Sequence, residues 1–508
     1  MLDSTSITPA IRRCPPDVTA TDQARVAKGL WAVAACFVTL ELAISARYGF
    51  HRDELYFLAA GRHPALGYVD QPPLAPMMTR LSSLLFGNSP TGIRIFPALT
   101  GGGVVIGAGL IARVFGGRMF AQLLAGISVA CAPILLASAH LAGTTVYDLL
   151  AWTLLTLFVL RAVVYNQSSQ WLWAGVVAGI GLENKELVVL ALLGLGCGII
   201  TTQARSHLRS RWPWLGLGVA LLLWAPNLAW QASHGWPSLA MSHALRVAHS
   251  SSSDYVTVLP AELIYVGLFA TPLVFCGARF LSRRVELRFV LVAVCAVLAY
   301  VVLVVPGRPY YVDGFLTTVM AAGAVWVEQR RTANHKRTNW MIAPIVGAVL
   351  MMWAILPVLP VATMARLPFL HKLNYDLGET VGWPELTSSV AKVYASLPPN
   401  QRLQTSIFTQ NYGEAGAISR YGPALGLPRP LSGHNNYPLW GPGDAPDATV
   451  IAVGSVDSLR ADFRHCVYDR TFHSPYGVNN DENGVQMWTC SGAKGPWSSF
   501  WGTLGHLD

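Results

Sequence analysis

The segment Pro72–Phe86 reads PPLAPMMTRLSSLLF, and whether it crosses a membrane decides the topology of the whole chain. The chain around it consists largely of apolar blocks of about 20 residues, the length that crosses ~30 Å of hydrocarbon. The segment itself is shorter and contains Arg80, and its apolar residues recur at the spacing of one helix face. Such spacing is typical of an amphipathic helix in the membrane surface. We therefore predict that this segment does not cross, and that residues 48–90 form one long loop.

The composition supports a membrane protein. Of 508 residues, 53% are hydrophobic and only 12% are charged, against roughly 25% charged in an ordinary soluble domain. The net charge of +9 comes from basic residues that sit mainly in short loops between apolar blocks, as the positive-inside rule produces. Nucleic acid is therefore not an expected partner, whereas membrane lipids are.

The basic loops set the orientation. If the N-terminus is cytoplasmic and Pro72–Phe86 stays outside, every strongly basic loop faces the cytoplasm. The first apolar block is long enough to remain as an anchor after a polar leader, residues 1–26. The apolar blocks predict eleven membrane spans, at about 27–47, 91–113, 119–139, 144–165, 170–183, 187–203, 213–231, 258–278, 287–305, 310–328 and 340–361.

The tail after residue 361 has a different character and lies outside in this topology. It is rich in Pro, Gly and Asn, with strand-like runs at Thr405–Thr409 and Thr449–Val453. Helix-like runs alternate with them, at Thr387–Ser396, Glu414–Tyr421 and Val456–Phe463. We predict an all-α polytopic membrane module, residues 27–361, followed by a small extracytoplasmic α/β domain, residues 362–508.

Two cysteines, Cys466 and Cys490, share this tail. An extracytoplasmic compartment is oxidising, so a disulfide between them is expected.

The external loop opens with the polar run Phe50-His51-Arg52-Asp53-Glu54-Leu55-Tyr56. Two adjacent carboxylates beside the hydrocarbon cost free energy, so their presence there indicates a function. The alternative is an ordinary helix start, where acidic residues are favoured. Because adjacent residues of a helix point about 100° apart, the two carboxylates cannot both face one substrate.

The order of motifs along the chain resembles that of the lipid-linked glycosyltransferases of the GT-C type. The similar groups are the bacterial protein-mannosyltransferase-like proteins of family 39 and the aminoarabinose transferases of lipid A. The resemblance covers almost the whole chain, because the Asp-Glu pair is followed by Tyr68-Val69-Asp70-Gln71-Pro72-Pro73, Thr144-Thr145-Val146-Tyr147-Asp148, Gly181-Leu182-Glu183-Asn184-Lys185, Pro226-Asn227-Leu228-Ala229-Trp230-Gln231, Gly307-Arg308-Pro309-Tyr310-Tyr311, Gln410-Asn411-Tyr412-Gly413-Glu414-Ala415-Gly416 and Ser432-Gly433-His434-Asn435.

The resemblance implies two juxtamembrane helices in the first external loop and an inverting sugar transfer with Asp53 as the catalytic carboxylate. An acceptor hydroxyl must lose its proton as it attacks the anomeric carbon, and a carboxylate can accept that proton. Glu54 is then expected to orient the loop, with His51 and Arg52 supporting the site.

The leaving lipid phosphate needs cations and hydrogen-bond donors rather than an acid. The predicted topology places Lys185, Arg308, Tyr310 and Tyr311 outside, where they could bind this phosphate. Lys185 could instead pair locally with Glu183 or Glu186, and Arg308 could be an interfacial cation. Asp148 begins a span from the outside, and capping of that helix is an equal reading of it.

The second polar run departs from the aminoarabinose-transferase pattern, because Asp70-Gln71 stands where a Glu-Lys pair is expected. Asp70 and Gln71 are taken as supporting residues. We expect no cofactor and no metal; the one divalent site that the residues suggest would join Asp70 to a histidine of the 232–256 loop, such as His243.

The sequence thus predicts an inverting transferase in a cytoplasmic membrane. Its donor would be a polyprenyl-phosphate sugar, and its acceptor a lipid, glycan or protein hydroxyl at the outer face. The alternative is a lipid-binding or lipid-translocating protein without chemistry. Neither the sugar nor the acceptor can be read from the sequence.

Overall fold

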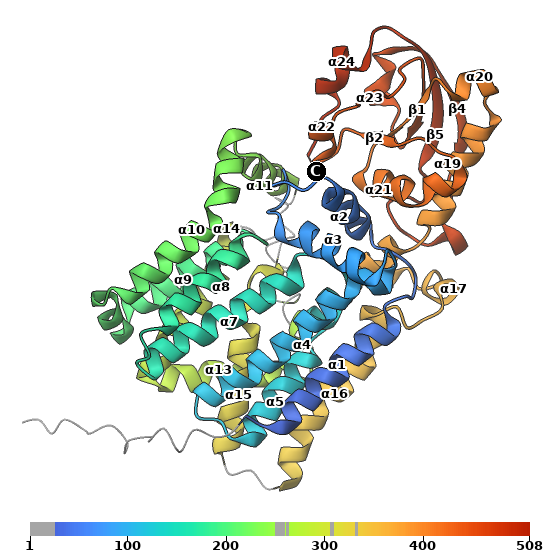
Figure 1. Cartoon of the computed structure of the whole chain (residues 1–508). Helices are drawn as coiled ribbons and strands as arrows, with labels where there is room; N and C mark the ends of the chain where they lie inside the picture. The colour runs from blue at the N-terminus through green and yellow to red at the C-terminus, as the bar shows by residue number, and fades with distance from the viewer. Residues whose placement is uncertain (1–25, 249–259, 261–263, 305–308, 331–333, 508) are drawn as a thin grey trace, which may run out of the picture.

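A computed structural model describes residues 26–248, 260, 264–304, 309–330 and 334–507 of the chain (Figure 1). A bundle of helices makes up the first two thirds, and a compact domain built on a β-sheet lies at one end of it. The bundle helices are α1 (Lys28–Ile44), α4 (Pro90–Val114), α5 (Met119–Ala130), α6 (Pro133–His140), α7 (Thr145–Val164), α8 (Gln170–Leu182), α9 (Val188–Thr201), α10 (Trp212–Ser233), α11 (Pro237–Ala248), α13 (Thr271–Arg283), α14 (Arg288–Val304), α15 (Leu316–Gln329) and α16 (Asn334–Ile355).

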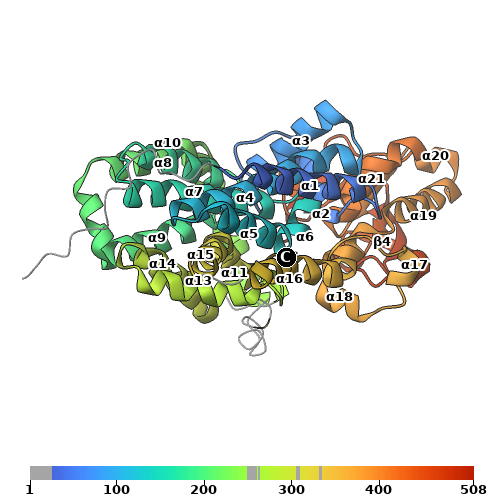
Figure 2. The ribbon, with the colours of Figure 1, turned by 90° about the horizontal axis from the view of Figure 1, so that it is seen from below.

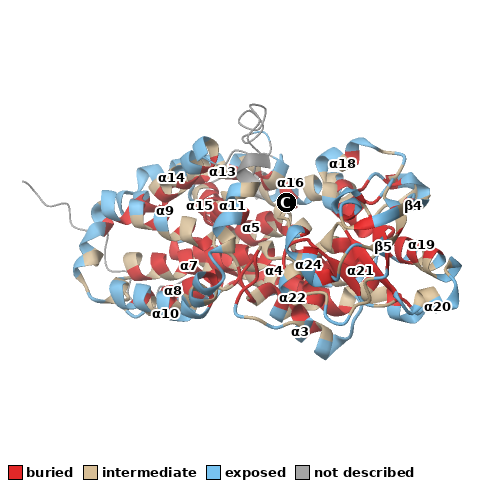
Figure 3. Cartoon of the chain, turned by 90° about the horizontal axis from the view of Figure 1, so that it is seen from above, coloured by how far each residue is buried: buried red, intermediate tan, exposed pale blue. Residues whose placement is uncertain are grey.

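The chain is a multi-pass membrane protein. Five helical segments among the described residues are long and apolar enough to cross a membrane, and two further pairs, α5 with α6 and α9 with the 3₁₀ turn Gln203–Arg209, could each be one bent span. Apolar side chains on the outside of α10 and α14 are exposed, as lipid-facing side chains would be (Figure 3). The count of eleven crossings stays a prediction, because several of the corresponding helices are shorter than a full span.

Three of the predicted spans are placed wrongly. The helix predicted at 340–361 is α16, which ends at Ile355 because a turn that contains Pro357 follows it. The helix predicted at 258–278 is α13, which begins only at Thr271 because Gly267 (φ +87°) and a turn precede it; part of the predicted range lies outside the described residues. The helix predicted at 310–328 begins at Leu316, because residues 309–315 form two short 3₁₀ turns, Pro309–Tyr311 and Asp313–Phe315. Tyr310 and Tyr311 therefore precede the helix.

The first loop contains the two expected juxtamembrane helices, α2 (Arg52–Arg62) and α3 (Leu74–Phe86). In α3, Met77, Leu81 and Leu84 are exposed while Ala75, Thr79 and Ser82 are buried. An exposed apolar face on a helix beside a membrane bundle is what a surface-lying helix presents to lipid.

The C-terminal domain is a mixed five-stranded sheet in the order β2-β1-β3-β5-β4. Strands β1, β2 and β3 are parallel, and β5 and β4 are antiparallel additions. Cys466 on β4 and Cys490 on β5 are direct cross-strand partners and form a disulfide. The strands are β1 (Thr405–Thr409), β2 (Pro430–Ser432), β3 (Thr449–Val453), β4 (Phe463–Thr471) and β5 (Gln486–Ala493), and the helices are α17 (Val361–Met364), α18 (Phe369–Leu373), α19 (Trp383–Ser396), α20 (Pro399–Arg402), α21 (Tyr412–Tyr421), α22 (Tyr437–Trp440), α23 (Asp457–Arg460) and α24 (Trp497–Phe500).

Strands β1 and β3 have the bounds that the sequence predicted. All five residues of each are buried, as is typical of a central strand of a sheet covered on both faces. The helix predicted at Val456–Phe463 is wrong, since only the single turn α23 forms and Phe463 already begins β4.

The domain packs directly on the first loop (Figure 2). Leu55 and Leu58 of α2 belong to the same buried cluster as Trp383 and Ile407 of the domain. Gly416 of α21 allows the close approach, because a Cβ at this position would lie 2.8 Å from the Cβ of Leu55. The loop and the domain therefore share one hydrophobic core.

Candidate active site

The two adjacent carboxylates lie at the first turn of α2, which a capping box holds in place. The His51 side chain accepts from the Asp53 N–H, and Glu54 accepts from the His51 N–H at 2.8 Å. This reciprocal arrangement satisfies backbone donors that a helix start leaves open. It orients Asp53 and Glu54 in different directions.

Glu54 points into the protein and is completely buried. Its carboxylate accepts two hydrogen bonds from the buried Arg94 of α4, at 2.8 and 2.7 Å, and a third from the Ala142 N–H at 2.8 Å. All of this is consistent with an orienting residue. Arg94 was not among the residues predicted from the sequence, although a charged residue inside an apolar span is a signal of function.

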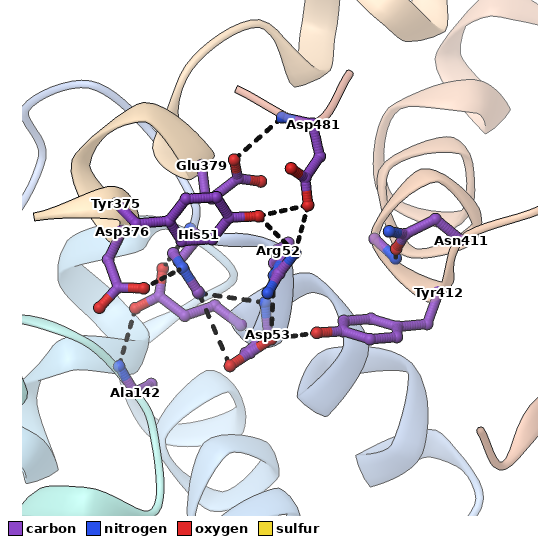
Figure 4. A network of polar contacts seen from close by, with 12 residues as sticks. His51, Arg52, Asp53, Ala142, Tyr375, Asp376, Glu379, Asn411, Tyr412 and Asp481 are labelled. Carbon is purple, nitrogen blue, oxygen red and sulfur yellow. Dashed lines mark hydrogen bonds and ion pairs between the residues drawn. The ribbon is translucent and has the colours of Figure 1, made fainter. Parts of the chain in front are cut away.

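Asp53 points the other way, and 44% of its side chain is exposed. Its carboxylate accepts a hydrogen bond of 2.7 Å from the Tyr412 hydroxyl of α21 (Figure 4). His51 and Arg52 lie further away, at 3.9 and 3.7 Å. The carboxylate is thus positioned by the C-terminal domain and retains free access to solvent.

His51 and Arg52 are held by residues of the C-terminal tail (Figure 4). Arg52 donates to the Tyr375 hydroxyl at 2.9 Å and to Asp481 at 2.8 Å, while His51 faces Asp376 at 3.5 Å. Burial lowers the pKa of His51, but the hydrogen bond and charge of Asp376 together with Asp53 outweigh it and raise the pKa.

The second polar run lies in the same site. Asp70 accepts a hydrogen bond of 2.8 Å from the Tyr56 hydroxyl. Burial raises the pKa of Asp70 to about 7, although the Tyr56 hydrogen bond lowers it. Gln71 is only 6% exposed, and its Nε2 has no hydrogen-bond partner among the described residues.

Lys185 lies in the break between α8 and α9, with its ammonium 5.0 Å from the centre of the Tyr310 ring. Burial raises the pKa of Glu186 while the charge of Lys185 lowers it, so a local interaction with Glu186 stays an alternative to phosphate binding. Tyr311 packs edge-on against Tyr310. Arg308 lies outside the described residues.

Asp148 does not cap α7. The N-cap of that helix is Thr144, and Asp148 accepts a hydrogen bond of 3.1 Å from Trp152 Nε1 one turn further on. The capping reading is therefore wrong, because Asp148 lies inside the first turn.

One cavity of about 1210 Å³ joins these groups. Its first wall, here called the loop–domain wall, contains His51, Asp53, Asp70, Gln71, Tyr375, Asp376, Tyr412 and Asn435. Its second, the membrane wall, is mostly apolar, with Pro133, Ile134, Leu141, Leu190, Ile264, Val304 and Met351, and has Lys185, Tyr310 and Tyr311 at its edge. Arg52 and Asp148 do not line it.

Lys372 of α18 also lines the cavity, and the sequence analysis did not select it. Tyr412 and Asn435, by contrast, lie in two of the tail motifs, although their role beside the first loop could not be deduced. No group of three or more His, Cys, Asp or Glu side chains suited to a metal ion occurs in the described part of the chain.

Comparison with known proteins places this architecture. The model of a family described as dolichyl-phosphate-mannose-protein mannosyltransferase matches residues 70–230. The crystal structure of ArnT from Cupriavidus metallidurans bound to undecaprenyl phosphate is similar with a TM-score of 0.57 and 16% identity, over 92% of this chain and 100% of that chain. The apo structure of the same protein gives a TM-score of 0.55 and 16% identity, over 91% and 97%.

The mycobacterial arabinofuranosyltransferase AftD is similar with a TM-score of 0.51 and 12% identity, over 93% of this chain and 40% of that chain. No curated protein matches the chain significantly in sequence. The chain therefore has the GT-C glycosyltransferase fold with a C-terminal sheet domain, which confirms the fold that the motifs indicated.

Proposed function

We propose that this protein transfers a sugar from a polyprenyl-phosphate donor to an acceptor hydroxyl, with inversion at the anomeric carbon. The observation that carries the proposal is the single cavity that joins an accessible carboxylate, Asp53, to a cation, Lys185, and to an apolar wall. These are the three chemical features that such a reaction needs. The GT-C fold, shared with an ArnT structure that contains undecaprenyl phosphate, supports it.

Asp53 acts as the base. The acceptor oxygen forms a bond to the anomeric carbon while the bond from that carbon to the phosphate oxygen breaks. The acceptor proton moves to Asp53, and the polyprenyl phosphate leaves with the electron pair. The Tyr412 hydroxyl keeps the carboxylate oriented, and the exposed part of Asp53 leaves room for the acceptor.

Lys185 binds the lipid phosphate and stabilises the charge that grows on it as it leaves. Its ammonium stands over the Tyr310 ring at the edge of the membrane wall. We assign Tyr310 and Tyr311 to the same phosphate region, and Arg308, which precedes them, as a second cation. The apolar side chains of the membrane wall then receive the first isoprene units of the donor, since they bury hydrocarbon without loss of hydrogen bonds.

The assay is sugar transfer by the purified protein in detergent, with a panel of polyprenyl-phosphate sugars and hydroxyl acceptors. Transfer from one donor, with an anomeric configuration in the product opposite to that in the donor, is the expected result. Retention of configuration would reject the single displacement. A protein that only binds or translocates lipid would bind the donor and yield no product.

We place the cavity at the outer face of the cytoplasmic membrane. Single-cysteine variants at Ser89 and Gln329, made without the other thiols, should react with a membrane-impermeant reagent in opposite ways. Ser89 should react in intact cells, and Gln329 only after lysis. A Ser89 site protected until lysis would contradict the topology.

A further inference from the structure

Two amide side chains of the loop–domain wall have hydrogen-bonding atoms that the described protein does not use. Gln71 Nε2 and Asn435 Oδ1 are both buried without a partner, in side chains that are 6% and 7% exposed. Both residues line the cavity. A buried donor or acceptor without a partner costs about 1–3 kcal/mol, so such atoms in a cavity wall point to a ligand that completes them.

The two residues belong to segments in direct contact. The Val69 N–H donates to Asn436 Oδ1 at 3.2 Å, which joins the segment before Gln71 to the segment after Asn435. On the other side, the Leu74 N–H donates to the Glu183 carbonyl at 2.8 Å, close to Lys185. The loop from Val69 to Leu74 therefore runs between the proposed phosphate region and the C-terminal domain.

Both amides are held in place by the backbone. Pro72 and Pro73 follow Gln71 and restrict the chain there, while the Tyr68 N–H donates to the Gln71 carbonyl at 2.9 Å. Asn435 has φ +49°, a left-handed conformation that Asn tolerates better than most residues. The backbone at both positions is thus restrained before a ligand binds.

We propose that Gln71 and Asn435 form the subsite that recognises hydroxyl groups of the donor's sugar. An amide N–H donates and an amide carbonyl accepts, so sugar hydroxyl groups can accept from Gln71 and donate to Asn435. The nearby carboxylates already accept from phenols, Asp70 from Tyr56 and Asp53 from Tyr412. The two amides differ from these acids in offering neutral hydrogen bonds, which suit sugar hydroxyls.

This inference rests on the proposed function, and binding measurements separate the two. The probes are undecaprenyl phosphate and the same lipid with a neutral hexose, a neutral pentose or an amino-pentose attached, each measured with the full-length protein in detergent. Wild type should bind a neutral sugar-lipid more tightly than the bare lipid phosphate. A wild type that binds none of these lipids would overturn the proposed function.

The variants test the subsite itself. Gln71→Met keeps the side-chain length and Asn435→Gly keeps the left-handed backbone, but each removes an amide. Each should weaken binding of the sugar-lipid by about three- to tenfold and leave the bare lipid phosphate unchanged. Asn435→Asp, which retains the accepting oxygen, should keep most of the wild-type affinity for the sugar-lipid.

A matched control is Ser138→Ala, because Ser138 lines the same cavity but already donates to the Leu135 carbonyl. It should bind both lipids as wild type does. The proposed subsite would be contradicted if Gln71→Met and Asn435→Gly kept the full preference for the sugar-lipid. It would also be contradicted if they weakened the binding of both lipids equally.

Discussion

The two walls of the cavity differ in what holds them in place. In the loop–domain wall, Asp53 and Asp70 each accept a hydrogen bond from a phenol, and residues far apart in sequence meet there. The membrane wall is made mainly of apolar side chains, with Lys185 at its edge. The proposed proton transfer would depend on side chains held in place by two domains, whereas the proposed binding of a lipid chain would require only an apolar surface.

The largest expected effect comes from Asp53 on the loop–domain wall. Asp53→Asn should lower turnover by about 10²–10⁴-fold, because a general base is lost, while donor binding stays near wild type. The matched control is Asp376→Asn, a second carboxylate of the same wall that faces His51 instead. If both variants lost turnover equally, Asp53 could not be distinguished as the base from Asp376 as a supporting residue.

The next effect tests the buried support beneath that wall. Arg94→Met should destabilise the protein by about 3–5 kcal/mol, because Glu54 would remain as a buried charge without its partner. The double variant Arg94→Met with Glu54→Leu should recover part of that stability in thermal unfolding. If the double variant is less stable than either single variant, the pair is not coupled in this way.

A smaller effect compares the two lysines of the cavity. Lys185→Ala should weaken binding of undecaprenyl phosphate by about tenfold or more, as expected for lost hydrogen bonds to a charged group. Lys372→Ala, the matched variant on α18, should change this affinity less. Affinities are measured by titration of the lipid. If Lys372→Ala weakened binding more than Lys185→Ala, the phosphate would bind near Lys372 and not near Lys185.

The last effect concerns the pH dependence of stability in the C-terminal domain. Burial raises the pKa of Glu414 to about 8 from an ordinary value near 4.5. Between these values the folded state holds a proton that the unfolded state has lost, so stability falls as pH rises, by up to about 1.4 kcal/mol per pH unit from this group.

Glu414→Gln removes that proton but keeps an oxygen that can accept from the Asn411 N–H. The unfolding midpoint of the variant should therefore decline less than that of wild type between pH 5 and about 8. The exposed Glu385→Gln should follow the wild-type curve. An unchanged decline in the Glu414 variant would assign the pH dependence to other groups.

Much of the candidate site was predictable because its signals are local. Asp53 and Glu54 are neighbours, and helix geometry alone divides their directions, which the structure shows as one exposed and one buried carboxylate. Lys185 was found because a cation between two apolar blocks is conspicuous. Arg94 was missed because its partner, Glu54, lies 40 residues away.

Hydrophobic periodicity within single segments predicted most helices of the bundle, the amphipathic helix α3 and the strands β1 and β3. Only the tertiary structure decided that Tyr412, 359 residues beyond Asp53, would donate to that carboxylate, and that Asn435 and Gln71 would line one cavity. Such contacts depend on how a folded domain packs on a loop of another, through one shared hydrophobic core. Periodicity cannot encode that packing, since it reports which face of an element is buried but not which distant residues cover it.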